Sequence, residues 1–255
     1  MKKKKQDIRQ STPLPFPLMA LLLIIIVTLT ALSYVRNGIY LNHVTLWADI
    51  TKRSPEKRRA HENYGQALSS AGFYKEALRE FRIVQALKDD ESVPARDLYR
   101  EIGVVYYRLE RYDDAIIAWQ QGLKDSPNDP SLLNNLSVVM LQKKRYDDAS
   151  RYALSALSVA PYMPQALNTM GQVHLAKKNY EKAVEYFLMA VERDPDVPQR
   201  YWNAAFALEQ VKKYNKAYQY AAKYAAMEQD PEARKRAFRY MEHLKNVMGG
   251  QSIRH

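Results

Sequence analysis

The sequence repeats the same residues every 34 positions. Three kinds of residue recur with this period: Tyr112, Tyr146, Tyr180 and Tyr214; Ala115, Ala149, Ala183 and Ala217; and Pro127, Pro161 and Pro195. A fixed period of this length is typical of repeat proteins, in which each unit packs only against its neighbours. The pattern therefore predicts an extended array of units, which offers a long surface to partners and seldom encloses a catalytic pocket.

Each unit is expected to be two short antiparallel helices. If Pro130 is position 1, Ser137 stands at position 8, Tyr146 at position 17, Ala149 at position 20 and Pro161 at position 32. Small residues at positions 8 and 20 let the two helices cross closely, whereas larger side chains would push the backbones apart. The proline at position 32 begins the turn into the next unit because proline cannot continue a helix.

This pattern resembles the tetratricopeptide repeat. The resemblance covers Arg58 to Pro231 as about five units of 34 residues, and it implies an all-α, right-handed solenoid over 58–231. Two units lack the family's glycine at position 8, where they carry Ser137 and Ala205, and the fifth unit ends without the proline. The step from the first unit to the second is 38 residues, which predicts an insertion near 89–94.

Helices are expected to close both ends of the solenoid. Residues 37–57 predict half a unit, whose lone helix runs from Asn42 to Arg53. Residues 232–250 predict a capping helix that stops at Gly249 and Gly250, followed by a disordered tail over 251–255. Such caps are needed because an open end of a solenoid would expose apolar surface.

The N-terminal region predicts a membrane anchor. Leu18–Val35 is an eighteen-residue, mostly apolar run without a charged residue. We expect a basic cytoplasmic tail over 1–14 and a transmembrane helix over 15–36 that contacts the lipid bilayer. The basic residues before the span favour a single-pass inner-membrane protein with a cytoplasmic N-terminus and periplasmic repeats. Two alternatives stay open: a buried core helix, and a signal peptide cleaved near Ala31–Ser33.

Composition argues against several other functions. The net charge is +11, but lysine and arginine scatter over helix ends and outer faces, so we expect no nucleic-acid partner. The chain has no cysteine, which excludes disulfides, thiol catalysis and cysteine metal sites. None of the five histidines is paired at metal-ligand spacing, and His174 stands at a core position. We therefore expect no catalytic residues, cofactor or metal, and no enzyme activity.

The resemblance implies that the first helix of each unit lines a concave groove. Asparagine and glutamine dominate this face in the later units, and a row of them can hydrogen-bond the backbone of an extended peptide. The candidate groove residues are Asn63, Gln66, Arg100, Tyr107, Asn134, Asn135, Asn168, Gln172, Trp202, Asn203 and Phe206. We expect Trp202 to be the strongest single contact. The alternative is that the asparagines are ordinary for the family and that the final helix covers Trp202.

A second resemblance is looser. Leu46–Leu68 is similar to the junction in bacterial membrane glycosyltransferases where the last span leads into tetratricopeptide repeats. The sequence thus favours a membrane-anchored scaffold that binds proteins or peptides in its groove and recruits or assembles a bacterial envelope complex. The alternative is an accessory subunit docked permanently on a polytopic membrane protein, such as a glycosylation, secretion or pilus assembly machine, with the groove unused. The sequence leaves the partner and the oligomeric state open.

Overall fold

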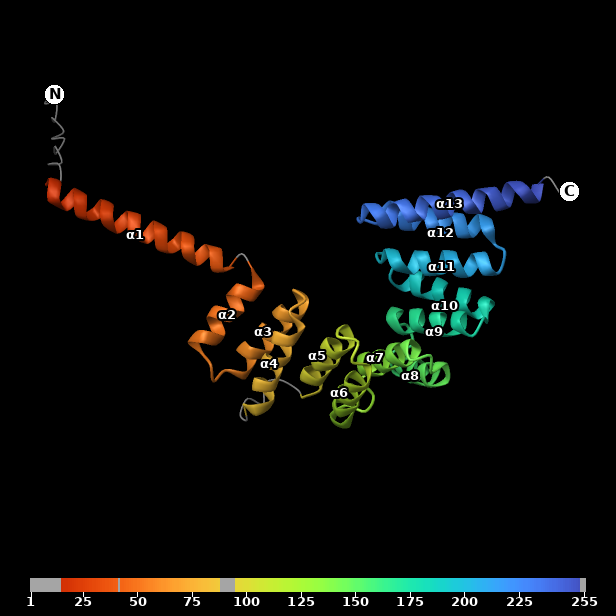
Figure 1. Cartoon of the computed structure of the whole chain (residues 1–255), viewed down its shortest axis with the longest axis horizontal. Helices are drawn as coiled ribbons and strands as arrows, with labels where there is room; N and C mark the ends of the chain where they lie inside the picture. Colours follow the sequence, from red (N-terminus) through yellow and green to blue (C-terminus); the bar gives the residue numbers. More distant parts are fainter. Residues whose placement is uncertain (1–14, 41, 88–94, 253–255) are drawn as a thin grey trace, which may run out of the picture. The chain divides into compact units, whose positions relative to one another are not determined.

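The structure is a computed structural model and describes residues 15–40, 42–87 and 95–252. These residues are helices joined by short connections (Figure 1). These residues form thirteen α-helices and no strand, so the predicted all-α class is confirmed for them. The chain divides into two compact units, Met1–Asp90 and Glu91–His255. The insertion predicted near 89–94 lies outside the described residues.

The first unit contains α1 (Phe16–Tyr40), α2 (His43–Arg53), α3 (Arg58–Ser70) and α4 (Tyr74–Ala86). The helices α3 and α4 pack as a hairpin, and α2 packs against α3, so the lone helix predicted from Asn42 to Arg53 is present. Asn42 caps α2, since its side chain accepts a hydrogen bond from the amide of Val44 at 2.8 Å. The buried His61 ties the hairpin together, with one ring nitrogen 2.6 Å from Glu80 Oε2.

Helix α1 occupies the segment for which the sequence predicts a transmembrane helix, residues 15–36. Many of its large apolar side chains are exposed, among them Phe16, Leu23 and Ile24. Within the described residues, however, no helix combines the length and the hydropathy that crossing a bilayer requires. This finding does not support the predicted transmembrane helix. The predicted tail over 1–14 and the side chains of 31–36 lie outside the described residues.

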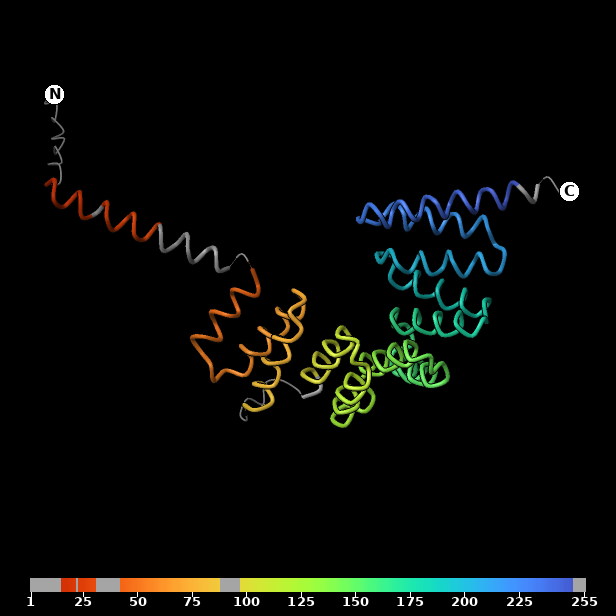
Figure 2. Tube along the Cα trace, viewed as in Figure 1, coloured from red at the N-terminus to blue at the C-terminus, as the bar shows by residue number. Residues whose placement is uncertain are grey.

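The second unit is a row of helical hairpins, followed along the trace in Figure 2. It contains α5 (Ala95–Arg108), α6 (Tyr112–Asp125), α7 (Pro130–Gln142), α8 (Tyr146–Val159), α9 (Pro164–Ala176), α10 (Tyr180–Arg193), α11 (Pro198–Gln210), α12 (Tyr214–Met227) and α13 (Pro231–Ser252). Each hairpin packs on the next, and among the first helices α9 also contacts both α7 and α11. Three of these first helices begin at a proline, which suits a position whose amide would have no partner inside the helix.

The helices of a hairpin cross at position 8, as predicted, and an aromatic ring fills the crossing. A Cβ added at Gly103 would lie 2.2 Å from Nε1 of Trp119, and one added at Gly171 would lie 2.6 Å from the ring of Phe187. Each aromatic residue stands at position 24 of the unit that contains its glycine. The glycine is therefore required by the close approach of a buried ring.

The two units without this glycine carry a smaller partner at position 24. In one unit Ser137 at position 8 is paired with Ala153 at position 24, and in the other Ala205 is paired with Ala221. All four residues are fully buried. The Ser137 hydroxyl donates a 2.7 Å hydrogen bond to the carbonyl of Ala149. The departures from the family pattern are thus compensated within each unit, because a larger residue at position 8 is paired with a smaller one at position 24.

The turn between the two helices of each unit uses a left-handed residue at position 15. The residues there are Gly72, Glu110, Lys144, Lys178 and Lys212, with φ values of 85°, 59°, 58°, 62° and 58°. Left-handed backbone costs a non-glycine residue roughly 1–2 kcal/mol. Four units therefore hold a strained turn that the sequence did not predict.

Helix α13 closes the second unit by packing on α12. The predicted stop at Gly249 and Gly250 is wrong, because α13 continues to Ser252. A glycine ends a helix when it takes the left-handed conformation, which Gly249 does not. Of the tail predicted over 251–255, residues 253–255 lie outside the described residues.

Candidate peptide-binding groove

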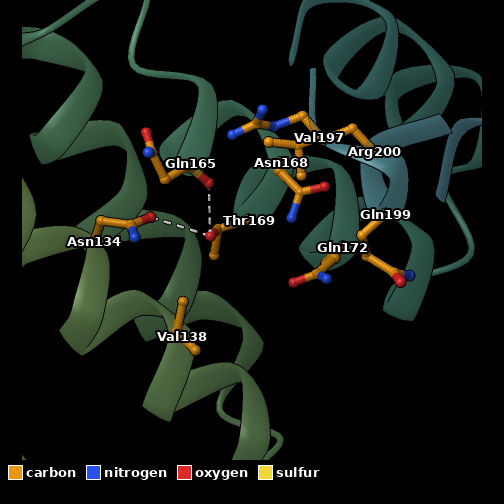
Figure 3. A pocket seen from close by; sticks show the side chains of 9 residues that line it. All are labelled: Asn134, Val138, Gln165, Asn168, Thr169, Gln172, Val197, Gln199 and Arg200. Carbon is orange, nitrogen blue, oxygen red and sulfur yellow. Dashed lines mark hydrogen bonds between the residues drawn. The ribbon is translucent and has the colours of Figure 1, made fainter. Parts of the chain in front are cut away.

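A cavity of about 330 Å³ opens on the face formed by the first helices (Figure 3). Its lining residues come from α7, α9, α11 and the turn before α11: Asn134, Val138, Gln165, Asn168, Thr169, Gln172, Val197, Gln199 and Arg200. Five of these nine are asparagine or glutamine, and the site is called the amide-lined cavity below. Its volume lies near the lower end of the roughly 300–1,000 Å³ typical of ligand pockets.

Hydrogen bonds between adjacent repeats hold the amides of this cavity in place. The Thr169 hydroxyl on α9 shares its one proton between two acceptors, Oδ1 of Asn134 on α7 at 3.0 Å and the carbonyl of Gln165 at 2.9 Å (Figure 3). Nδ2 of Asn203 on α11 donates to Oδ1 of Asn168 on α9 at 2.8 Å. Both links join position 5 of one unit to position 6 of the next. Asn203 is therefore one half of a link between neighbouring helices, and Thr169 fills the same position of the preceding unit.

Three buried polar side chains line the cavity. Asn134, Thr169 and Arg200 are 7%, 2% and 6% exposed. Buried polar atoms are normally hydrogen-bonded, because leaving one unpaired costs about 1–3 kcal/mol. Nδ2 of Asn134 has no hydrogen-bond partner among the described residues, and it is not one of the fully buried atoms that lack one, so a ligand or water can reach it.

Arg200 also lines the cavity, although it was not among the candidates predicted from the sequence. Its Nη1 lies 2.5 Å from Oδ2 of Asp194 and donates to the carbonyl of the same residue at 3.0 Å. The pair neutralises the one charged side chain among the nine lining residues. Its position in the repeat could have indicated it: Arg200 stands at position 3 of its unit, where the preceding unit has Ala166. Both residues are buried, and a charged residue at a buried position calls for a partner.

Trp202 is partly buried and packs against the core, so its ring is not an open anchor for a ligand. Its ring centroid lies 5.0 Å from that of Tyr224 and 5.1 Å from that of Tyr240 on α13. Burial and the neighbouring Glu209 raise the pKa of Tyr240 far above its usual range. The expectation that Trp202 would be the strongest contact is therefore not supported, whereas Phe206 remains 42% exposed.

The other predicted residues lie outside the amide-lined cavity. Tyr107 packs against Tyr112 and Trp119 inside its own hairpin, and burial raises its pKa. Arg100 is engaged by Asp97, with Nη1 and Oδ1 2.9 Å apart. Three further predicted residues are partly buried and do not line it: Asn63, Gln66 and Asn135. Asn63 and Gln66 belong to α3 of the first unit.

His174 is a packed histidine, as predicted. Its ring stacks on Tyr186 with centroids 5.4 Å apart and planes 11° from parallel. Its Nδ1 is buried without a hydrogen-bond partner within the described part of the chain. Burial lowers its pKa, and the nearby Lys182 and Lys177 act in the same direction.

Comparisons with known proteins agree with this fold. Residues 65–131 and 164–197 match two family models, both described as tetratricopeptide repeat. No curated protein sequence matches the chain. Among solved structures, the chain resembles the Cut9–Hcn1 hetero-tetramer of the APC/C, with 17% identity, a TM-score of 0.64, and coverage of 75% of this chain and 38% of that one.

Two other solved structures are matched over almost their whole length. The structure of pilF from Pseudomonas aeruginosa matches with 21% identity and a TM-score of 0.61, over 76% of this chain and 92% of that one. YrrB, a tetratricopeptide protein with an unusual peptide-binding site, matches with 19% identity and a TM-score of 0.50, over 76% of this chain and 97% of that one. These likenesses concern the fold. The stacked hairpins and the two family matches agree with tetratricopeptide repeats over residues 65–131 and 164–197.

Proposed function

We propose that this protein is a scaffold that binds an extended segment of a partner protein across the first helices of its second unit. The observation that carries the proposal is the amide-lined cavity, which spans three successive repeats and includes an accessible amide donor, Nδ2 of Asn134, without a partner among the described residues. Side-chain amides can pair with both the N–H and the C=O groups of a peptide backbone. The peptide-binding site of YrrB, a similar fold, supports the same use here.

We further propose that residues 15–36 hold the scaffold at a bacterial inner membrane, with its N-terminus in the cytoplasm and its repeats in the periplasm. Support comes from the uncharged apolar run of Leu18–Val35 and from the basic residues before it. Tethering would raise the effective concentration of the groove near envelope partners and so help recruit or assemble a complex. Extraction of membranes with alkaline carbonate and protease access to a C-terminal tag test this part separately.

The alternative is an accessory subunit that docks permanently on a polytopic membrane protein through its second helices. Exposed apolar side chains on these helices favour it, including Ile117 on α6 and Leu154 on α8, which are 65% and 49% exposed. In that arrangement the amide-lined cavity would have no ligand.

Site-specific photo-crosslinking in intact cells separates the two proposals. A crosslinking amino acid at Gln172 reports on the cavity, and the same amino acid at Leu154 reports on the second-helix face. The scaffold proposal expects a protein adduct from Gln172 that disappears when Asn168 is changed to aspartate. Adducts from Leu154 alone would contradict it and favour the accessory subunit.

A further inference from the structure

We propose that the outer face of α4 lies on an anionic lipid surface, which it binds through three basic side chains flanked by two exposed apolar ones. This inference goes beyond the proposed function, because it involves neither the amide-lined cavity nor a transmembrane span. It comes from the exposure and charge of α4 and from a comparison with the second helices of the other repeats.

The basic side chains form a row along α4. Lys75, Arg79 and Arg82 are exposed and stand at i, i+4 and i+7, a spacing that places them on one side of a helix. Ala77 and Val84, on the opposite side, are buried. Among the described residues, none of the three cations has an ion-pair or hydrogen-bond partner. We call this row the α4 basic face, and no contact within the described chain accounts for its charge.

The row is particular to the first repeat. It occupies positions 18, 22 and 25 of the unit, and no other second helix carries three basic residues there. At position 18, Asp113 of α6 and Asp147 of α8 pair with Lys143 and Lys177 of the following repeats, at 2.7 and 2.5 Å. Since α4 has Lys75 at this position, the stacking of repeats does not require its charge.

The acidic residues of α4 do not cancel this charge. Glu80 faces His61, with Oε2 and Nδ1 2.6 Å apart, and only 17% of its side chain is exposed. Glu76 is exposed and is the other acidic residue of the helix. The outer surface of α4 therefore keeps an excess of positive charge.

Exposed apolar side chains flank the α4 basic face. Phe73, in the turn before α4, is 52% exposed, and Ile83 on α4 is 37% exposed. The amide of Phe73 donates to the carbonyl of Leu68 at 2.8 Å, so the turn fixes the backbone at this exposed ring. The other four repeats have a polar residue at the position of Phe73, namely Arg111, Arg145, Asn179 and Lys213. The same repeat thus combines unpaired cations with exposed apolar surface.

A membrane surface matches both properties. Anionic lipids offer phosphate groups to lysine and arginine, and aromatic rings gather at the level of the headgroups. An acidic protein segment would pair with the cations and leave Phe73 and Ile83 exposed to water. The same compact unit contains α1, many of whose large apolar side chains are exposed. Each basic residue near an anionic surface strengthens binding roughly fivefold, so the three together contribute about a hundredfold.

A fluorescent label on α4 of the full-length chain tests the inference. The sequence has no cysteine, so Ala86→Cys, an exposed position on the same side as the basic row, takes a single nitrobenzoxadiazole dye. The labelled chain is incorporated into vesicles of phosphatidylcholine, alone or with about one third phosphatidylglycerol. We expect emission at least twofold brighter and shifted to the blue in the anionic vesicles. The difference should disappear in about 0.5 M salt, where charges are screened within a few ångströms.

Two matched variants locate the effect on α4. Replacing the three residues of the α4 basic face by glutamine should abolish the difference between the two kinds of vesicle. The control removes three exposed cations from the second unit and should leave the difference unchanged: Lys216→Gln, Lys235→Gln and Arg239→Gln. A dye at Ser158→Cys, the position in the third repeat that corresponds to Ala86, should respond equally to both vesicles. Circular dichroism should show equal helicity for all of these chains.

Three results would overturn the inference. The first is a dye on α4 that responds equally to neutral and anionic vesicles, and the second is a response that persists in the glutamine variant. The third is a response to soluble polyglutamate and not to anionic vesicles, which would indicate an acidic protein partner instead. Each of these results would leave peptide binding in the amide-lined cavity untouched, because that site lies in the second unit.

Discussion

Replacing Gly103 by alanine tests the packing rule that makes each repeat. The new Cβ would lie 2.2 Å from Nε1 of Trp119, and 2.5 and 2.6 Å from two further ring atoms, whereas ordinary contacts begin near 3.4 Å. The indole is 2% exposed, so it has little room to retreat. It also donates a 3.1 Å hydrogen bond from Nε1 to the carbonyl of Arg100, which a displaced ring would stretch or break.

The expected cost follows from three opposing effects. Overpacking a core costs about 1–3 kcal/mol, and a buried N–H left without its partner costs about 1–3 kcal/mol. Alanine in place of glycine in a helix returns about 0.5–1 kcal/mol. The variant should therefore be destabilised by about 3 kcal/mol, which lowers the melting temperature of a domain of this size by about 6–12 °C.

The assay is urea and thermal unfolding followed by far-ultraviolet circular dichroism. The control is Gly249→Ala, because Gly249 is helical and a Cβ there meets nothing within 4 Å, so stability should stay equal or rise slightly. The double variant Gly103→Ala/Trp119→Ala reproduces the alanine pair of the fifth repeat, Ala205 and Ala221. Its loss of stability should fall short of the sum of the single losses by about 1–3 kcal/mol. Strict additivity, or a Gly103→Ala variant within 0.5 kcal/mol of the parent, would refute the crossing argument.

Two further predictions concern the turns and pH. Lys144→Gly should raise the unfolding free energy by about 0.5–1 kcal/mol, because Lys144 holds a φ of 58° that glycine adopts without strain. Gly72→Ala should lower the unfolding free energy, because Gly72 holds a φ of 85°. A loss of stability in both variants would contradict the strain assigned to these turns. Because burial lowers the pKa of His174, the folded state prefers the neutral ring, and the unfolded chain binds more protons below about pH 6.5. Stability should therefore fall as the pH drops from about 7 to 5. His174→Tyr should flatten that fall, and an unchanged slope in urea unfolding at the two pH values would assign the effect to other groups.

The sequence predicted the repeats with good accuracy because their boundaries depend on local chemistry. Pro130, Pro164 and Pro198 each begin a first helix, and Tyr146 begins the second helix of its unit, as the register requires. The prediction at Gly249 failed since a glycine only permits a left-handed stop and does not impose one.

The candidate site was predicted less well. Asn134, Asn168 and Gln172 do line the cavity, because helical periodicity fixes which residues share a face. Trp202 shares that face too, but α13 packs Tyr240 against it. Periodicity places a residue on its own helix and carries no information about which other helix covers it.

The 34-residue period by itself determined the hairpins, their register and the face that each first helix turns toward its neighbours. Only the tertiary structure decided how the amides pair between repeats and that Asp194 neutralises the buried Arg200. The physical reason is range: helix starts and faces follow from contacts within a few residues along the chain. Hydrogen bonds between repeats and the charge of the cavity depend instead on side chains that meet through the stacking of separate helices.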